Sequence, residues 1–251
     1  EDGNTPWCIG VESGNATGWT ATDWMEDLML RTTSPENYDR WVSNDLSFNS
    51  PEVLNAMEVY GQFSRNDDYV AGGAASVATT FFGDAPKGLF TSPASCMMHR
   101  QASFIPAFFP KKGEEVANGE ADFFYFPPYA SKDLGNPVLG AGTLWTMTKD
   151  SPATRAFFEF MKEPSANEAW MSQGTFLTAH KGVNLDAYAT PALRKQGEIL
   201  ANATTFRFDA SDLMPGAIGA GAFWSEMTAF ANGQDAKTTA DNIQAAWDAI
   251  K

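Results

Sequence analysis

Hydrophobic and polar positions alternate along the chain with two different periods. Short apolar runs bounded by glycine, proline or serine are typical of strands, and they occupy 5–12, 96–99, 122–128 and 143–148. Apolar residues that recur every three or four positions are typical of helices, and they occupy 20–31, 34–41, 50–60, 76–82, 151–162, 165–174, 190–203, 222–231 and 238–250. Because strands and helices follow one another, the pattern predicts an α/β fold with mostly parallel sheets.

The first predicted helix carries typical start signals. Thr20 or Thr22 could cap it, because a threonine hydroxyl accepts a hydrogen bond from the free N–H groups of a first turn. Asp23, Glu26 and Asp27 lie in its early turns, where the positive end of the helix dipole favours acidic side chains. The pattern therefore predicts that these three carboxylates are helix-start charges.

Composition and charge narrow the class of protein. The chain has 251 residues, of which 43% are hydrophobic and 19% charged, so it can form one large domain or two small ones. Its net charge of −14 argues against nucleic acid or an anionic membrane as the main partner, because phosphate groups require a basic surface. No apolar run is long enough to span a bilayer. No basic and apolar leader precedes the first predicted strand, so we expect any export signal to lie outside this sequence.

The two cysteines, Cys8 and Cys96, lie in predicted strands. Only His99 and His180 could join them as metal ligands, so we expect no zinc site, and the sequence indicates no other metal and no cofactor. The cysteines could form one disulfide if their strands are neighbours, or they could be two buried thiols. Spacing alone leaves both alternatives open.

A glycine-rich stretch, GAIGAG, occupies 216–221. It lacks the lysine and hydroxyl residue of a phosphate-binding loop, and its spacing differs from that of dinucleotide-binding motifs. Gly140-Ala141-Gly142 fails the same test. These glycines are therefore interpreted as positions where the backbone turns or approaches another group closely.

Two pairs of carboxylates could serve a glycosidase, Asp23 with Asp27 and Asp209 with Asp212. Nothing in the sequence places an acid and a base on either side of one glycosidic bond. We therefore favour structural roles for these carboxylates, at helix starts and in turns. Neither histidine belongs to a Ser-His-Asp order or a nucleophile elbow.

Aromatic residues at the ends of predicted segments are candidates for ligand binding. Trp19 follows a glycine-rich turn, Phe104 follows a predicted strand, and Trp224 lies at a helix start. Flat rings can stack on the apolar faces of sugar rings, and ligand pockets combine apolar walls with a few polar groups. Core packing is the simpler explanation for the tryptophans in the middle of helices, Trp24, Trp41, Trp170 and Trp247.

Several stretches together carry a family resemblance. They are PWCIGVESGNATGWTATDWMEDLMLR, CMMHRQASF, LGAGTLWTMTKDSPATRAFFEFM, GTFLTAHKG, and FRFDASDLMP followed by GAFW. In this order they resemble the larger, C-terminal part of bacterial periplasmic solute-binding proteins of carbohydrate ABC importers. The resemblance covers essentially the whole chain and is strongest to the α-glucoside-binding, maltose-binding-protein-like type.

This resemblance implies a set of ligand-binding residues. Trp224 becomes the leading sugar-stacking residue, and Trp19 becomes a second aromatic wall. The resemblance also assigns to the site Gln101, Phe104, Gly140, Gly142, Thr143 and Phe223. It places the strands of Cys8 and Cys96 side by side, which favours the disulfide.

The resemblance further implies a two-lobed, type II periplasmic-binding-protein fold with one lobe mostly present. Residues 1–137 and 207–251 would form that lobe, and 138–206 would be an incomplete part of the other. Apolar surface around Phe157, Phe160 and Trp170 would then be exposed, and a second chain could cover it.

The implied function is that of a binding protein and not of an enzyme. We expect a periplasmic component that closes on an α-glucoside and docks on the membrane subunits of an importer. Two alternatives remain: a carbohydrate-active hydrolase that uses paired carboxylates, and a binding protein for a non-sugar solute such as a polyamine.

Overall fold

The computed structural model describes residues 5–174 and 176–251, and the chain divides into two compact units. The first unit contains Glu1–Lys112, Pro127–Gly140 and Thr205–Lys251, and the second contains Gly113–Phe126 and Ala141–Thr204. The assignment of the chain to two lobes of a binding protein stays a prediction. Within the described residues, no helix combines the length and the apolar character that are needed to cross a membrane.

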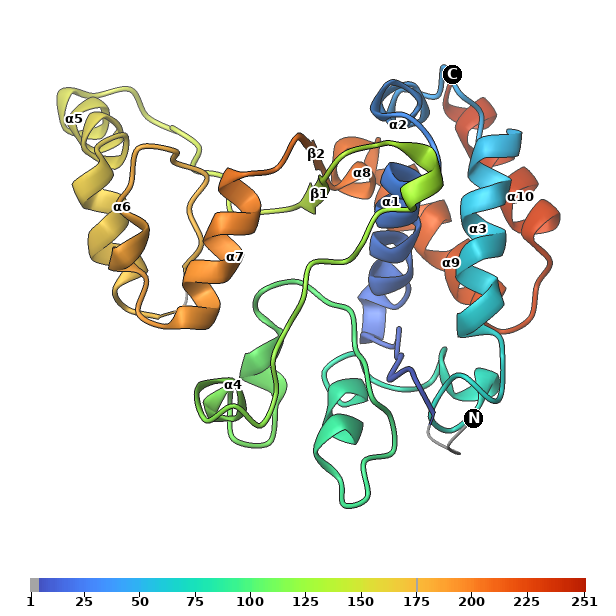
Figure 1. Ribbon diagram of the computed structural model, residues 1–251. Coiled ribbons are helices and arrows are strands. Elements are labelled where there is room, and N and C mark those ends of the chain that lie inside the picture. Colours follow the sequence, from blue (N-terminus) through green and yellow to red (C-terminus); the bar gives the residue numbers. More distant parts are fainter. Residues whose placement is uncertain (1–4, 175) are drawn as a thin grey trace. The chain divides into compact units, whose positions relative to one another are not determined.

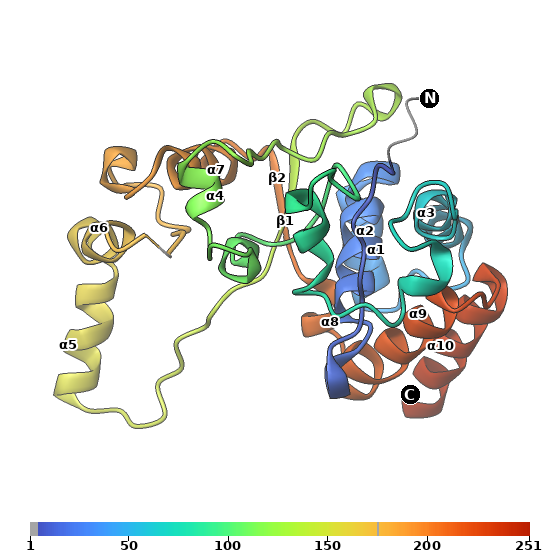
Figure 2. The ribbon, with the colours of Figure 1, turned by 90° about the horizontal axis from the view of Figure 1, so that it is seen from below.

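The first unit is built around one central helix, α1 (Trp19–Thr32). It lies beside α2 (Pro35–Val42), α3 (Pro51–Ser64) and α9 (Trp224–Ala231), as both ribbon views show (Figures 1 and 2). Every residue from Thr20 to Thr32 is buried. A helix that is buried on all sides is expected to be apolar, so the charged residues of α1 need partners inside the unit.

The remaining helices of the first unit complete its core. They are α8 (Ala210–Leu213), a π-helix at Ala217–Phe223, and α10 (Ala236–Ile250), which packs on both α9 and the π-helix. The largest fully buried side chains of this unit include Trp41, Tyr38, Tyr60, Phe48 and Phe223.

Regular strands are short and parallel. β1 (Pro137–Gly140) pairs with β2 (Thr205–Phe208) in a two-stranded parallel sheet whose register runs from Pro137 opposite Thr205 to Gly140 opposite Phe208. The predicted strand at 5–12 makes isolated parallel bridges, from Trp7 to Val70 and Met98 and from Glu12 to Phe81. The predicted strands at 5–12 and 96–99 are therefore neighbours, although neither forms a continuous ladder.

Three sequence-based expectations were wrong. The predicted strands at 122–128 and 143–148 are irregular in the described structure, because an apolar run becomes a strand only where another strand takes its backbone hydrogen bonds. The predicted helix at 76–82 is instead a short 3₁₀ turn at Ala74–Ser76 followed by further turns. Its backbone groups pair elsewhere: the N–H of Val11 donates to the carbonyl of Val77, and the N–H of Phe82 donates to that of Glu12.

The second unit consists of helices joined by irregular segments. Its helices are α4 (Glu114–Ala117), α5 (Pro152–Met161), α6 (Pro164–Met171) and α7 (Pro191–Ala201). The Trp145 side chain is 53% exposed and contacts Phe157, with ring centres 5.4 Å apart. Phe157 and Phe160 are 42% and 55% exposed, so this unit presents apolar surface.

Short 3₁₀ turns complete the described elements of the chain. They lie at Gly14–Ala16, Ala74–Ser76, Ala85–Phe90, Ile105–Phe108, Ala130–Lys132 and Leu185–Ala187.

A disulfide crosses the first unit. It joins Cys8 to Cys96, two buried residues whose Cα atoms lie 5.4 Å apart and which are 88 positions apart in the chain. The N–H of Cys8 also donates to the carbonyl of Met98 at 2.8 Å. The bond therefore holds together two segments that already pair through their backbones.

Candidate functional site

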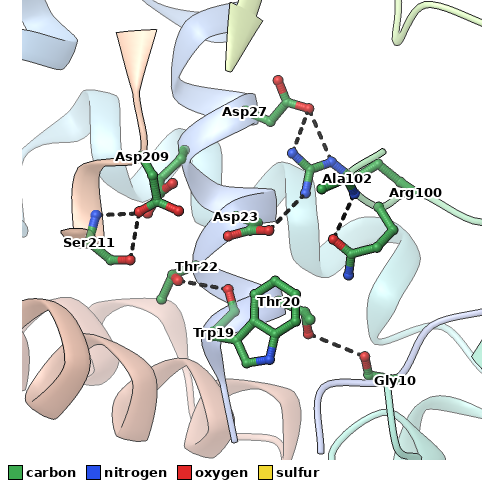
Figure 3. A network of polar contacts seen from close by, with 12 residues as sticks. Gly10, Trp19, Thr20, Thr22, Asp23, Asp27, Arg100, Ala102, Asp209 and Ser211 are labelled. Carbon is green, nitrogen blue, oxygen red and sulfur yellow. Dashed lines mark hydrogen bonds and ion pairs between the residues drawn. The ribbon is translucent and has the colours of Figure 1, made fainter. Parts of the chain in front are cut away.

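The N-terminal end of α1 presents the first aromatic candidate, Trp19. The residue before it, Gly18, is the cap, with a φ of 106° in the left-handed region. The expected threonine cap was wrong because both hydroxyl groups have other partners. That of Thr20 donates to the carbonyl of Gly10 at 3.2 Å, and that of Thr22 donates to the carbonyl of Trp19 at 2.8 Å (Figure 3).

Gly18 also brings together the starts of two helices. A Cβ atom at this position would collide with the carbonyl oxygen of Trp224 and would lie 2.7 Å from the hydroxyl oxygen of Thr228. Trp224 is the first residue of α9, and its carbonyl accepts the Thr228 hydroxyl at 2.9 Å. The backbone of Gly18 therefore lies directly against that of α9, which places Trp19 and Trp224 at adjoining helix ends.

Trp19 belongs to an aromatic cluster made of Trp19, Phe82, Phe104 and Phe108. Its ring centre lies 5.1 Å from that of Phe82 and 6.1 Å from that of Phe104. The ring centre of Phe108 lies 5.0 Å from that of Phe82 and 6.1 Å from that of Phe104. Phe104 is 44% exposed, whereas Trp19 and Phe82 are half-buried. Phe82 and Phe108 were not predicted as site residues, because each looks like an ordinary core phenylalanine until the loops are brought together.

The Phe-Trp pair at the start of α9 divides between core and surface. Trp224 is half-buried, and its indole N–H is buried without a hydrogen-bond partner among the described residues. Phe223 is fully buried and packs against Trp41 and Phe48, with ring centres 5.6 and 5.1 Å apart. Phe223 is therefore a core residue, and we remove it from the candidate ligand site.

The other predicted site residues have different surroundings. The side-chain oxygen of the half-buried Gln101 accepts a hydrogen bond from the N–H of Ala102 at 2.8 Å (Figure 3). Gly140 ends β1, and its carbonyl accepts the N–H of Asp209 at 2.9 Å. Gly142 and Thr143 are exposed and belong to the second unit. A role for these residues in ligand binding stays a prediction.

A cluster of buried charges lies along α1, contrary to the prediction of helix-start charges. Because α1 begins at Trp19, its acidic residues lie beyond the first turn and face the interior. The guanidinium of Arg100 donates to one oxygen of Asp27 at 2.9 and 3.1 Å, and Arg31 pairs with the other. Arg100 also lies 3.7 Å from a carboxylate oxygen of Asp23. No local pattern in the sequence indicates these partners.

The cluster extends to the segment that follows β2. Asp209 caps α8, where it accepts the N–H of Asp212 at 3.0 Å. It also accepts the hydroxyl of Ser211 at 2.8 Å (Figure 3). Glu26 accepts the N–H of Ser211 at 3.0 Å. Together with Asp23 these residues form an acidic triad, Asp23, Glu26 and Asp209, in which one oxygen of each lies within 4.8 Å of the others.

Burial changes the acidity of the triad. It raises the pKa of both Asp23 and Glu26 well above their ordinary values, and the nearby negative charge of Asp209 raises each further. The positive charge of Arg100 opposes this rise. The interior thus disfavours the ionised form of both side chains.

The arrangement does not favour a paired-carboxylate enzyme. Asp23, Asp27 and Asp209 are at most 8% exposed. Asp27 is held by two arginines, and Asp209 is held by the helix end that it caps. A glycosidase needs two carboxyl groups that face an open site with room for a sugar. One surface hollow of about 300 Å³ lies elsewhere in the first unit and contains none of the predicted site residues. It is lined by Glu58, Gly61, Arg65, Phe230, Asp235 and Ala236.

The fold is similar to that of a solved structure. The chain resembles a chitin oligosaccharide binding protein with a TM-score of 0.75, covering 98% of this chain and 60% of that one. At 16% sequence identity this likeness shows the fold alone. The predicted periplasmic-binding-protein-like α/β fold is thereby confirmed. No protein-family model matches the chain.

Two curated relatives are considerably more similar in sequence. The chain is 61% identical over its whole length to the alpha-glucosides-binding periplasmic protein AglE of Rhizobium meliloti (strain 1021), of which it covers 55%. It is 42% identical, over 98% of its length, to the osmoprotective compounds-binding protein GgtB of Synechocystis sp. (strain ATCC 27184 / PCC 6803 / Kazusa), of which it covers 58%. The predicted resemblance to a part of an α-glucoside-binding protein is confirmed, and the chain spans little more than half the length of these relatives.

Proposed function

We propose that this chain is part of the solute-binding component of an ABC importer and that its ligand is an α-glucoside. The observation that carries the proposal is the 61% identity to AglE along the entire chain. Both curated relatives are named as binding proteins, which supports binding and not catalysis.

The aromatic cluster is the proposed sugar surface. Phe104 is exposed and lies beside the half-buried Trp19, so a sugar ring could stack on a continuous apolar surface that also includes Phe82. Trp224, the leading stacking residue implied by the family resemblance, begins the adjoining α9 and would stack on the sugar beside this cluster. Gln101 would hydrogen-bond to sugar hydroxyls, which favours the correct epimer because a buried hydroxyl without a partner costs about 1–3 kcal/mol.

The remaining parts of the proposal concern the intact protein. Gly140, Gly142 and Thr143 would lie in the connection that bends when a sugar is enclosed. The closed form would dock on the membrane subunits of the importer, and we place the protein in the periplasm. A second chain, or further lobe, would cover the apolar surface around Phe157 and Phe160.

An osmoprotective solute is the second candidate ligand, and it is supported by the 42% identity to GgtB over nearly the whole chain. A small zwitterion is the form of such a solute that differs most from an α-glucoside. The two candidates differ in chemistry, because a small zwitterion has no extended apolar face that could stack on Trp19 and Phe104.

Isothermal titration calorimetry with maltose, trehalose, sucrose and palatinose tests the proposal. We expect saturable binding of at least one of these α-glucosides and weaker binding of the β-linked control, cellobiose. Absence of heat with all four sugars would contradict the proposal. Binding of glycine betaine without binding of any sugar would favour the second candidate.

A further inference from the structure

The three carboxylates of the acidic triad are buried close together. Glu26 is 0% exposed, and Asp23 and Asp209 are each 8% exposed, so all three carboxylates lie inside the first unit. Asp23 and Glu26 come from the same face of α1, while Asp209 follows β2. Figure 3 shows the carboxyl group of Asp23 between Asp209 and the guanidinium group of Arg100.

The charges around the triad do not balance. Among the described residues, four buried carboxylates lie near two guanidinium groups. The carboxylates belong to Asp23, Glu26, Asp27 and Asp209, and the guanidinium groups to Arg31 and Arg100. When all four acids are ionised, two negative charges are in excess. Both arginines contact Asp27, and the contact of Arg100 with Asp23 is long, at 3.7 Å. Uncompensated buried charge is strongly unfavourable, so the excess must be balanced either by protons on the acids or by a bound cation.

One atom of the triad points independently to a ligand. Glu26 uses Oε1 to accept the N–H of Ser211 at 3.0 Å. Its second oxygen, Oε2, is fully buried and has no hydrogen-bond partner within the described chain. A buried carboxylate oxygen without a partner is rare and costly, and an ion is one of the few arrangements that satisfy it.

We propose that Asp23, Glu26 and Asp209 bind a divalent cation and that Ca²⁺ fits this site best. The ligands are carboxylate oxygens, which suit a hard cation, and no sulfur or imidazole takes part. Ca²⁺ binds oxygen at about 2.3–2.6 Å, so two of its ligands can be up to about 5 Å apart. The spacing within 4.8 Å satisfies this limit. Mg²⁺ demands near-ideal octahedral geometry and usually keeps several waters, so a site made of buried protein oxygens favours Ca²⁺.

This inference revises the sequence-based expectation of no metal. That expectation rested on the two cysteines and two histidines and interpreted the acids of α1 as helix-start charges. The cation would neutralise the excess charge and would join α1 to the segment 209–211, which follows β2. Its role is structural and does not depend on which solute the protein binds.

Calcium titration of the chelator-treated chain at pH 7.5 tests the site. We expect one Ca²⁺ per chain by calorimetry, with a Kd of about 10⁻⁶–10⁻³ M, and a rise in Tm. Glu26→Gln should weaken Ca²⁺ binding at least tenfold and abolish the rise in Tm. Glu58→Gln is the matched control, because it makes the same chemical change at an exposed position of α3 and should bind Ca²⁺ as the wild type does.

A second variant, Asp209→Asn, tests the same site in case Glu26→Gln does not fold. Circular dichroism shows whether each variant is folded. Weakened binding in either folded variant, with normal binding in Glu58→Gln, supports the site. No calcium heat in the wild type would overturn the proposal and would leave protons as the balancing charge. Equal calcium affinity in wild type, Glu26→Gln and Asp209→Asn would also overturn it.

Discussion

The backbone of Gly18 lies directly against the carbonyl oxygen of Trp224, so the helices that carry both candidate sugar-stacking tryptophans begin at one place. Two requirements coincide at Gly18. Its φ of 106° is unfavourable for any side chain, and a Cβ atom has no room beside α9. This close backbone contact therefore brings Trp19 and Trp224 near each other, although they are far apart in the sequence.

Gly18→Ala is expected to destabilise the protein by more than about 2 kcal/mol, because the left-handed backbone costs about 1–2 kcal/mol and the collision with Trp224 adds to it. Gly14→Ala is the matched control. Gly14 also has a positive φ, of 57°, but nothing lies within 4 Å of an added Cβ atom. Urea unfolding measures both. Equal losses of stability in the two variants would show that the contact with α9 contributes nothing.

Trp19→Ala is expected to weaken α-glucoside binding about tenfold or more, which corresponds to about 1.4 kcal/mol, because a stacking surface is lost. Phe104→Ala should weaken binding as well. Phe104 is 44% exposed, so its removal should leave the Tm nearly unchanged. Calorimetry and thermal unfolding separate the two effects. Tyr69→Ala, which removes a similarly exposed aromatic ring outside the cluster, should bind as the wild type does. Full affinity in both Trp19→Ala and Phe104→Ala would rule out the aromatic cluster as the sugar surface.

Loss of the disulfide is expected to lower the free energy of unfolding by about 4–5 kcal/mol, the chain-entropy value for a loop closed across 88 positions. The double variant Cys8→Ala/Cys96→Ala removes the bond without leaving a free thiol. Urea unfolding of this variant and of the oxidised wild type gives the difference. Two titratable thiols in the folded, unreduced wild type would show that the bond does not form.

His99 is expected to make stability depend on pH. Burial lowers its pKa from 6.5 to about 4, although its Nδ1–H donates to the carbonyl of Cys8 at 2.7 Å and partly opposes the shift. Between these pH values the unfolded state binds more protons than the folded state. The contribution of His99 is therefore complete above about pH 6.5 and declines as the pH falls towards 4, with about 2 kcal/mol lost by pH 5.

The measurement for His99 is a comparison of urea unfolding between wild type and His99→Asn at pH 7.5 and pH 5. Asparagine retains a side-chain donor for the Cys8 carbonyl but does not titrate. On going to pH 5, wild type should lose about 2 kcal/mol more than the variant. The same pH dependence in both proteins would mean that His99 takes up its proton without cost.

Much of the helical structure could be predicted because its signals are local. The Ser-Pro steps at 34–35 and 151–152 precede α2 and α5, and the serine side chains accept hydrogen bonds from Asn37 and Thr154 as caps. Such signals involve residues three or four positions apart. The predicted helix at 76–82 failed because its backbone groups pair with residues 11 and 12, which no local pattern reveals.

The candidate site shows the same division. Trp19 was found from its position after a glycine-rich turn and Trp224 from its position at a helix start. Their neighbours in the sequence do not indicate that Phe223 packs in the core against Trp41 and Phe48. Phe82 was missed because its contact with Trp19 crosses more than sixty positions. The acids of α1 were misread because a carboxylate at a helix start and one beside a distant arginine look alike in the sequence.

Local sequence was enough to predict several helix caps, the periodic helical faces, the acidic character of the chain and the aromatic residues at segment ends. Each of these depends on composition or on chemistry within a few residues. Long-range packing determined which apolar runs became strands and which aromatic ring of the Phe223-Trp224 pair entered the core. It also brought Asp23, Glu26 and Asp209 together. Those outcomes depend on backbone and charge partners far away in the chain, because hydrogen bonds, burial and electrostatic interactions act through space and not along the sequence.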